Sequence, residues 1–429
     1  MYRILIFMNP LHRLLNLPHT RNIIINTFGT YLGYGFAVFY IVFLVRVFPP
    51  VEFGVLSVLL TFSYLLANIF SFGMPASVYA HVPHLVQDRS KVMNFILSNF
   101  LVLSILSGIS IFAVYILSPH LDVRFFKTGA PQYQYMYALL GTQMFIWQNF
   151  VQDILNASGK FLQINIAINV ANLIKAVLLI WLALAGMLGI TQVLIVGGLI
   201  GPCIVFGLVV VQRRWLVRAV LGTQASWEHI KLRFTATYFL SSQLFQLASR
   251  SSLFFVAYFL TRPEVGYFSL SQRVILAVIT SADSVTQVMS AQFAKAKTWD
   301  EAKRLFKHSF TYMLLPTAMF VGGILMPAQM YNLVFGQSYA ASTPVTKALS
   351  FAYLPFPFLA IVMLYFLYTR KKPVIVLGVN ALMLMVVVGL QYVLVPQIGL
   401  FGPAVATFAA LVAAGGYLGL MLKNSKTPG

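Results

Sequence analysis

The sequence predicts an all-α, polytopic membrane protein with twelve transmembrane helices, arranged as two six-helix pseudo-repeat lobes around a central cavity. Composition, a series of long apolar runs and a weak internal repeat predict this fold. Of the 429 residues, 59% are apolar and 9% are charged, whereas a soluble domain is about 45–50% apolar and about 25% charged. A membrane span needs roughly 20 apolar residues, so the chain has enough for about 12 or 13 spans. This composition argues against a disordered chain, a secreted disulfide scaffold and a soluble enzyme.

Apolar runs bounded by charge, Pro or Gly place the spans along the chain. Short loops join them, and no segment outside them is long enough for a separate catalytic domain. The expected spans are 23–46, 55–78, 92–117, 135–155, 162–185, 188–211, 234–258, 267–293, 309–334, 345–368, 373–395 and 399–422.

The charge distribution predicts the orientation. The chain carries 29 basic and 9 acidic residues, a net charge of +20. With a cytoplasmic N-terminus, 21 basic residues fall in cytoplasmic segments, and the outer loops hold five: Arg46, Arg124, Lys127, Arg262 and Lys347. The positive-inside rule therefore places both termini in the cytoplasm. Because the charges are spread among short loops, we expect contact with anionic membrane lipids and no nucleic-acid partner.

This topology divides the chain into five segments. The first 22 residues lack the features of a cleaved signal peptide and are expected to form a retained cytoplasmic arm. The segments are the arm (1–22), an N-lobe (23–211), a cytoplasmic inter-lobe linker (212–233), a C-lobe (234–422) and a cytoplasmic tail (423–429).

The sequence contains none of the usual catalytic or metal-binding motifs. Cys203 is the only cysteine, so an internal disulfide is impossible, and its apolar surroundings predict a small buried side chain. No cluster of His, Cys, Asp or Glu has metal-ligand spacing, and no phosphate loop, nucleophile elbow or zinc-protease helix is present. We therefore expect neither an enzyme nor a cofactor or metal.

An internal repeat supports the two lobes. Glu52-Phe53-Gly54 and Glu264-Val265-Gly266 each precede a span. Gly54 and Gly266 are 212 positions apart. The same separation relates residues 155–160, which close span four, to residues 367–372, which close span ten. A separation of 210 relates Leu188-Gly189-Ile190, which opens span six, to Ile398-Gly399-Leu400, which opens span twelve. A six-span unit returns the chain to its starting side, so the two copies have parallel topology. We expect an axis along the membrane normal and a site between the lobes near the midplane.

Three segments carry a family resemblance. The turn after the first span reads Val-Arg-Val-Phe-Pro-Pro-Val-Glu-Phe-Gly (45–54), the turn after span nine reads Phe-Gly-Gln-Ser-Tyr (335–339), and residues 392–407 lead into the last span with Pro396, Gly399 and Gly402. In order and spacing these segments resemble the Wzx-type O-antigen and polysaccharide flippases, of the superfamily that includes the MATE exporters.

The resemblance implies a substrate and a location. It implies that an undecaprenyl-pyrophosphate-linked oligosaccharide moves from the cytoplasmic to the periplasmic leaflet of the bacterial inner membrane. Membrane lipids and this lipid-linked oligosaccharide are then the expected partners, with a polysaccharide polymerase and a chain-length regulator as candidate protein partners.

Four ionisable residues lie well inside expected spans: Lys175, Arg250, Arg273 and Asp283. An ionisable side chain at membrane depth is costly and is by default a functional candidate. Three of the four are basic, and unpaired cations in a cavity suit a pyrophosphate, because Arg and Lys form charge-assisted bonds to phosphate oxygens.

Amides and hydroxyls at helical spacing lie along the same spans and could hydrogen-bond a glycan. The candidate substrate-binding residues are Arg250, Lys175, Arg273, Gln243, Gln246, Asn169, Asn172 and Asn68. Asp283 and Asp153 are candidate ion-coupling residues, because the resemblance implies ion coupling in some members.

Each polar residue has a simpler alternative role. Amides and hydroxyls in membrane helices often hold helices together, contributing about 0.6 kcal/mol on average. Arg273 lies near the start of its span and could extend to the interface, or pair with Asp283. Gly73-Met74-Pro75 predicts a kink that either shapes span two or acts as a hinge.

Two other functions compete with the flippase. A cation-coupled multidrug exporter of similar architecture would need acidic residues deep in the cavity, but the mid-span balance is basic. A membrane-embedded polysaccharide polymerase would need catalytic groups in a sizeable outer loop, and the longest such segment, about 118–134, has only Asp122, Arg124 and Lys127.

Overall fold

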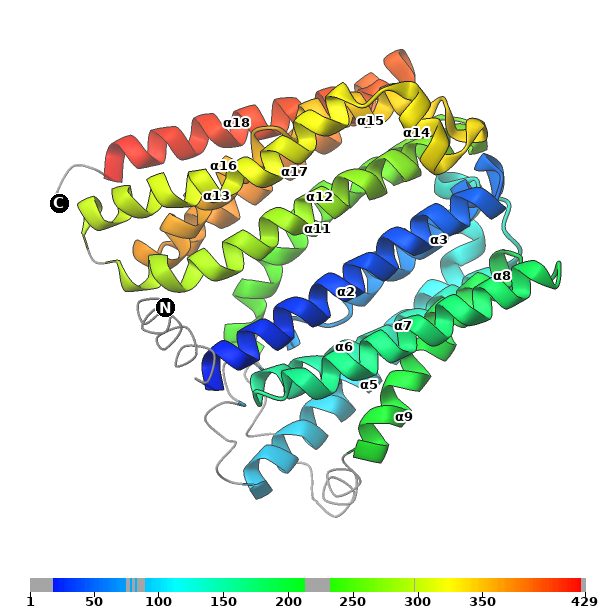
Figure 1. Ribbon diagram of the computed structural model, residues 1–429, viewed down its shortest axis with the longest axis horizontal. Coiled ribbons are helices and arrows are strands. Elements are labelled where there is room, and N and C mark those ends of the chain that lie inside the picture. Colours follow the sequence, from blue (N-terminus) through cyan, green and yellow to red (C-terminus); the bar gives the residue numbers. More distant parts are fainter. Residues whose placement is uncertain are drawn as a thin grey trace, which may run out of the picture. The chain divides into compact units, whose positions relative to one another are not determined.

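The computed structural model describes residues 18–74, 78, 82, 89–212, 232–296 and 298–425. These residues form helices and turns, and no β-strand occurs among them (Figure 1). Eight stretches are long and apolar enough to cross a membrane, and one of them, Pro373–Lys423, contains two helices. The chain is therefore an all-α, multi-pass membrane protein, as the composition predicts.

Each of the twelve expected spans overlaps one long helix or one run of shorter helices, while the number of membrane crossings stays a prediction. The long helices are α2 (Pro18–Val47), α3 (Pro50–Ile69), α5 (Arg89–Leu121), α6 (Gln132–Ala157), α7 (Phe161–Leu184), α11 (Leu232–Phe259), α12 (Arg262–Lys295), α13 (Trp299–Leu325), α17 (Pro373–Ile398) and α18 (Gly402–Ser425). The runs are α8 (Ile190–Leu194), η2 (Ile195–Ile200) and α9 (Gly201–Gln212), and then α15 (Ser342–Tyr353), α16 (Phe356–Leu364) and η5 (Tyr365–Thr369). Shorter elements are η1 (Asp122–Phe126), α14 (Ala328–Phe335), η4 (Gln337–Tyr339) and η6 (Gly399–Phe401).

Helix α13 differs from the expected span 309–334. It begins well before residue 309, because Thr298 and Glu301 form a capping box in which the Glu301 N–H donates to Thr298 Oγ1 at 3.3 Å. It ends at Leu325, shortly before Pro327, and residues 328–335 form the separate helix α14.

Helix α3 also differs from its expected span, 55–78. It ends at Ile69, and Phe72 (φ 48°) and Gly73 (φ 72°) adopt left-handed conformations that a right-handed helix cannot contain. The predicted kink at Gly73-Met74-Pro75 is therefore a helix end, and Pro75 lies outside the described residues.

The internal repeat is visible in the backbone. Gly159 (φ 72°) and Lys371 (φ 50°), which occupy equivalent positions of the repeat, both adopt the left-handed conformation after their helices end. This conformation is costly for a residue with a Cβ. Lys371 nevertheless adopts this conformation at the position where the first half has Gly159. Both halves therefore need the same turn.

The described helices fall into two compact units, each discontinuous in sequence. Unit 1 comprises Met1–Tyr40, Leu66–Ile116 and Gln132–Ala236, and unit 2 comprises Ile41–Leu65, Leu117–Pro131 and Thr237–Gly429. The predicted division into lobes at a linker stays a prediction, because residues 213–231 of the linker lie outside the described part, as do 1–17 of the arm and 426–429 of the tail.

Unit 1 is built around α6, α7 and the α8–η2–α9 run. Helix α7 packs on α9 through small and branched side chains, with Ala167, Ala171 and Val205 buried. Gly141 of α6 meets Gly198 of η2 so closely that a Cβ on Gly141 would lie 3.0 Å from the Gly198 Cα. Such small residues let membrane helices approach each other closely.

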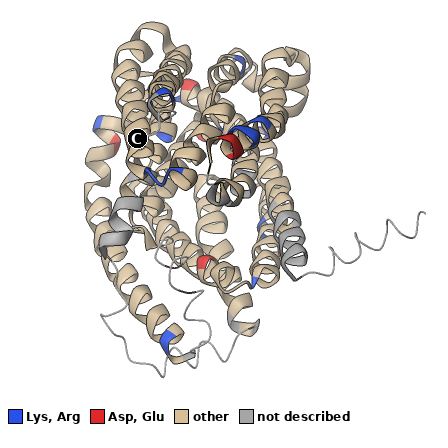
Figure 2. Cartoon of the chain, turned by 90° about the vertical axis from the view of Figure 1, so that its left-hand side faces the viewer, with Lys and Arg blue, Asp and Glu red and all other residues tan. Residues whose placement is uncertain are grey.

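Unit 2 contains most of the C-terminal half. Helices α17 and α18 pack along each other, and α12 packs on α13, α15 and α16. Hydroxyl groups join α12 to α15: Thr346 Oγ1 donates to Ser271 Oγ at 2.9 Å, and Ser271 Oγ donates to the Ser342 carbonyl at 3.0 Å. Charged residues are sparse along the helices (Figure 2).

Cys203 is exposed on α9, so its expected burial is wrong. An apolar side chain of a membrane helix can face lipid as readily as protein, and hydropathy does not distinguish the two environments.

Candidate functional site

Two arginine side chains contact one face of α3 within unit 2. Phe53, Ser57 and Tyr64 share this face, because spacings of four and seven residues return to the same side of a helix. Arg250 reaches it from α11 and Arg273 from α12. We call these five residues the arginine site.

Arg250 is held by an aromatic ring and an amide. Its guanidinium carbon lies 3.8 Å from the centroid of the Tyr64 ring, the distance of a cation–π contact. Its Nε donates a hydrogen bond to Gln246 Oε1 at 3.2 Å, so the two predicted site residues do share a helix face. Gln243, one turn before Gln246, is buried.

Arg273 occupies the other end of the site. Its Nη2 donates to Ser57 Oγ at 3.4 Å, and its guanidinium carbon lies 5.4 Å from the centroid of the Phe53 ring. Arg250 also exerts a repulsive charge–charge interaction on Arg273. The site therefore concentrates two like charges on one face of α3.

Among the described residues, no carboxylate pairs with Arg250 or Arg273. Hydrogen bonds to an amide oxygen and a hydroxyl orient the guanidinium groups and, within the described residues, leave their charge uncompensated. An anion bound between them would relieve their repulsion and accept charge-assisted hydrogen bonds. No group of three or more His, Cys, Asp or Glu in the described part of the chain could hold a metal ion.

Lys175 belongs to unit 1. Its Nζ lies 5.5 Å from the centroid of the Tyr40 ring, and the Tyr40 hydroxyl donates to the Asn172 carbonyl at 2.5 Å. Gly201 leaves room for the lysine, because a Cβ there would lie 2.6 Å from the Lys175 Cδ. Asn172 thus uses its backbone here, and Tyr40 provides the aromatic surface.

Asn169 joins two helices of unit 1. Its Nδ2 lies 3.0 Å from the Gly29 carbonyl oxygen on α2 and 2.9 Å from the Asn165 carbonyl oxygen on its own helix. Gly29 and Gly33 form a G-x-x-x-G pattern on α2, and a Cβ on Gly29 would lie 2.5 Å from the Asn165 Cγ. Asn169 therefore supports helix packing, and its predicted contact with substrate stays a prediction.

The remaining predicted residues lie elsewhere. Asn68 is one turn beyond Tyr64 on α3 but belongs to unit 1. Asp153 is partly buried on α6 of unit 1, and the side chain of Asp283 lies outside the described part of the structure. Ion coupling and a link between Arg273 and Asp283 stay predictions.

The aromatic partners of the cations were not among the predicted site residues. Tyr64 had a usable signal, because Thr61, Tyr64 and Asn68 follow one another at helical spacing along span two. Tyr40 and Phe53 had none, since aromatic residues are frequent throughout this chain, at 15% of its residues.

Two of the three segments that carry the family resemblance meet in unit 2, at the end predicted to face outward. The Tyr339 hydroxyl donates to the Phe48 carbonyl at 2.8 Å, and the Tyr339 ring packs edge-on against Phe53. Arg46 donates to the Leu333 and Val334 carbonyls in the last turn of α14. These contacts fix the start of α3, and with it Phe53 of the arginine site.

Solved structures show the same fold at low sequence identity. A lipid II flippase, MurJ, in an inward closed conformation has a TM-score of 0.76 at 14% identity, covering 93% of this chain and 87% of that one. An inward-facing multidrug resistance MATE family transporter of the MOP superfamily has a TM-score of 0.68 at 17% identity, with coverage of 92% and 96%. A MOP superfamily transporter from Pyrococcus furiosus, described as having a binding pocket of reverse polarity that suggests a different function, has a TM-score of 0.63 at 17% identity, with coverage of 97% and 98%.

Sequence comparison gives the family. No curated protein sequence matches the chain. A family model described as "Polysaccharide biosynthesis protein" matches residues 19–290, more than half of the chain. The chain, which has the helical fold of the MOP superfamily, therefore belongs to the polysaccharide biosynthesis protein family.

Proposed function

We propose that this chain is a flippase for an undecaprenyl-pyrophosphate-linked oligosaccharide, which it moves from the cytoplasmic to the periplasmic leaflet of a bacterial inner membrane by alternating access. The arginine site carries the proposal. Its two guanidinium groups face the same side of α3 and have no carboxylate partner among the described residues.

The chemistry of the site matches a lipid pyrophosphate. A guanidinium group presents its N–H donors in a plane that suits phosphate oxygens, and it remains charged at membrane depth. The rings of Tyr64 and Phe53 lie next to the guanidinium groups of Arg250 and Arg273, respectively. The N–H groups at the edges of the two guanidinium groups then remain for hydrogen bonds to an anion. The polyprenyl tail needs no polar partner and stays in the lipid.

A complementation experiment tests the proposal. A deletion strain receives wild-type protein, Arg250→Ala, Arg273→Ala or the control Arg124→Gln, which removes an exposed arginine outside the site. Surface polysaccharide and undecaprenyl-linked repeat units are measured at matched protein level. A lost hydrogen bond to a charged group is worth about 1.5–3 kcal/mol, so we expect roughly tenfold to a hundredfold less transport in the first two variants.

The lipid measurement identifies the step. Accumulation of repeat units on the cytoplasmic face supports a flippase, whereas a change in polymer length without accumulation indicates a polymerase. Wild-type transport by both Arg250→Ala and Arg273→Ala would refute a role for the site.

Sensitivity of the deletion strain to cationic drugs tests the alternative of a multidrug exporter. The fold is shared with MATE transporters, but a site of positive charge disfavours cationic drugs. We therefore expect the deletion to leave drug sensitivity unchanged.

A further inference from the structure

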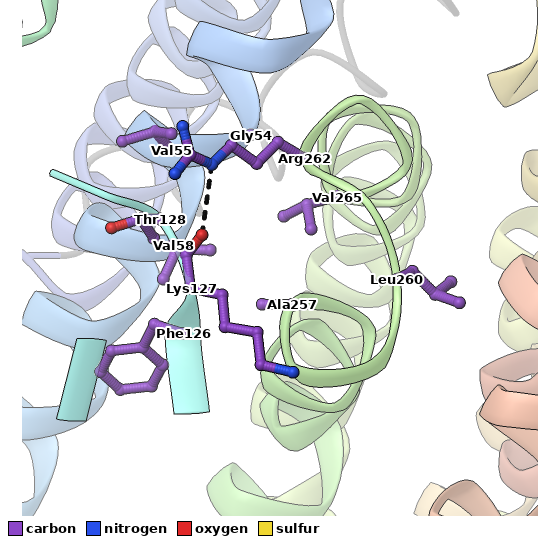
Figure 3. Close-up of a pocket in the computed structure, with 10 residues that line it drawn as sticks. All are labelled: Gly54, Val55, Val58, Phe126, Lys127, Thr128, Ala257, Leu260, Arg262 and Val265. Carbon is purple, nitrogen blue, oxygen red and sulfur yellow. Dashed lines mark hydrogen bonds between the residues drawn. The ribbon is translucent and has the colours of Figure 1, made fainter. Parts of the chain in front are cut away.

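A basic pocket lined by residues other than those of the arginine site lies in unit 2, at the end predicted to face outward (Figure 3). Residues 54–58 of α3, the segment after η1 and the turn between α11 and α12 line about 240 Å³ of empty space, part of it open to solvent. Val55, Val58, Phe126 and Val265 form apolar walls, and Lys127 and Arg262 supply positive charge. No predicted function uses this pocket.

Backbone carbonyls hold both cations. Lys127 Nζ donates to the Tyr258 carbonyl at 2.7 Å and lies 4.5 Å from the centroid of the Tyr258 ring. Arg262 Nε donates to the Lys127 carbonyl at 3.2 Å, and its guanidinium lies against Gly129. Within the described part of the chain these are the only hydrogen bonds of the two side chains, so most of their N–H donors remain available.

None of the described residues that line the pocket carries a carboxylate. Asp122 is the acidic residue on the adjoining segment, and its carboxylate accepts from the Thr128 N–H at 2.9 Å, the Thr128 hydroxyl at 2.5 Å and the Gly129 N–H at 3.0 Å. Glu264 accepts from the N–H and hydroxyl of Thr261 in the cap of α12. Both acids are thus directed to backbone and hydroxyl donors and, among the described residues, form no ion pair with Lys127 or Arg262.

Helix α12 begins at the pocket. Arg262 and Val265 of its first turn line the pocket, whereas the lining residues of α3 begin only at Gly54, beyond the first turn of that helix. The N-terminus of a helix carries a partial positive charge that favours anions. The dipole of α12 therefore adds to the charges of Lys127 and Arg262.

From these observations we propose that the pocket binds a phosphate group. Phosphate oxygens accept stronger hydrogen bonds from cations than neutral carbonyls do. A bound phosphate therefore draws Lys127 and Arg262 from the Tyr258 and Lys127 carbonyls. A phospholipid headgroup, the pyrophosphate of a lipid carrier and free phosphate share this chemistry.

The test measures binding to the purified full-length protein, with Arg250→Ala in every variant so that the arginine site is weakened equally in all of them. The probes are inorganic pyrophosphate in detergent, and nanodiscs of phosphatidylcholine with increasing phosphatidylglycerol. Thermal unfolding is monitored by tryptophan fluorescence, and the rise in Tm with probe concentration gives the apparent Kd. Lys127→Met/Arg262→Gln is compared with the control Arg124→Gln, which removes an exposed charge on the same segment without touching the pocket.

We expect the double variant to bind the probe at least tenfold more weakly than its parent. The control should bind the probe as tightly as the parent does. A response to phosphatidylglycerol alone assigns the site to a lipid headgroup, and a response to pyrophosphate assigns it to a free or carrier-borne phosphate. Equal affinity in the double variant and its parent, or no response of the parent to any probe, would overturn the proposal. If the double variant does not fold, Lys127→Met alone serves, with the same expected direction. Because Arg250 is absent throughout, the result is independent of the proposed transport function.

Discussion

Gly54 and Gly266, which are equivalent positions of the internal repeat, pack against each other at the starts of α3 and α12. A Cβ on Gly54 would lie 2.7 Å from the Arg262 carbonyl oxygen and 2.9 Å from the Gly266 nitrogen. A Cβ on Gly266 would lie directly against the Pro50 carbonyl. Pro50 and Arg262 are themselves equivalent in the repeat, so each glycine meets the start of the other's helix. This reciprocal contact is what a two-fold axis between two parallel repeats produces.

We predict that Gly54→Ala and Gly266→Ala each destabilise this arrangement. The clashing atoms belong to backbone, which cannot move aside as a flexible side chain can. Inserting a methyl group into such a contact costs about 1–3 kcal/mol. The Tm of the purified variants, measured in one detergent, should fall in both.

Gly207→Ala on α9 is the matched control, since nothing lies within 4 Å of a Cβ there. Alanine is favoured over glycine inside a helix by roughly 0.5–1 kcal/mol, so this control should keep or raise the Tm. If Gly54→Ala and Gly266→Ala behave like the control, the two helices do not meet at these glycines.

A second prediction separates packing from substrate contact at Asn169. Its side chain joins α7 to the Gly29 carbonyl on α2, and such bonds between membrane helices are worth about 0.6 kcal/mol on average. Asn169→Ala should therefore lower the Tm slightly and leave transport per folded molecule unchanged. A large loss of transport at unchanged Tm would instead assign Asn169 to the substrate.

Gly29→Ala should have the larger effect on stability, because its Cβ would lie 2.5 Å from the Asn165 Cγ. Gly33→Ala, on the same helix, is the control, with Asn169 Oδ1 3.9 Å from its Cβ. Equal Tm values for the two variants would contradict close packing of α2 on α7 at Gly29.

Hydropathy and spacing predicted the class of the fold and the equivalence of Gly54 and Gly266. They could not predict that these glycines touch, because a repeat defines equivalent positions and leaves the location of the axis open. The starts of α12 and α13 were among those predicted too late, although Thr261 with Glu264 and Thr298 with Glu301 have the spacing of capping boxes. A hydropathy window finds the apolar middle of a span, so it misses the polar first turn of such a helix.

The candidate site was predicted only in part, because the sequence does not show which helices face each other. Helical periodicity places Gln246 on the face of Arg250, and the structure joins them. It does not identify which other helix faces that side, so Ser57 and Phe53 could not be paired with Arg273 from sequence. The cations were conspicuous because charge is rare in membrane spans, whereas their aromatic partners resembled the apolar background.

The cation–π contact between Arg250 and Tyr64 gives a third prediction. Tyr64→Leu removes the ring that lies 3.8 Å from the guanidinium carbon, and such contacts are worth about 0.5–2 kcal/mol. Transport at matched protein level should fall roughly twofold to thirtyfold. Tyr64→Phe keeps the ring and should retain most of the activity. If both variants lose activity equally, the hydroxyl of Tyr64 and not its ring supports transport.

The last prediction concerns Tyr339, which is fully buried and anchors the α14–η4 segment to the start of α3. Tyr339→Phe removes the donor to the Phe48 carbonyl. Leaving a buried acceptor unpaired costs about 1–3 kcal/mol, so the Tm should fall. Tyr312→Phe on α13 is the control, because Tyr312 is 58% exposed, and it should leave the Tm unchanged.

Tyr339→Ala connects this anchor to the arginine site. It also removes the ring that packs edge-on against Phe53, whose own ring lies 5.4 Å from the guanidinium carbon of Arg273. Phe53 then loses its support on one side, and Arg273 loses a fixed neighbour. Transport per folded molecule should therefore fall in Tyr339→Ala and remain near wild type in Tyr339→Phe. Wild-type transport by folded Tyr339→Ala would show that the anchor stabilises the fold without positioning Arg273.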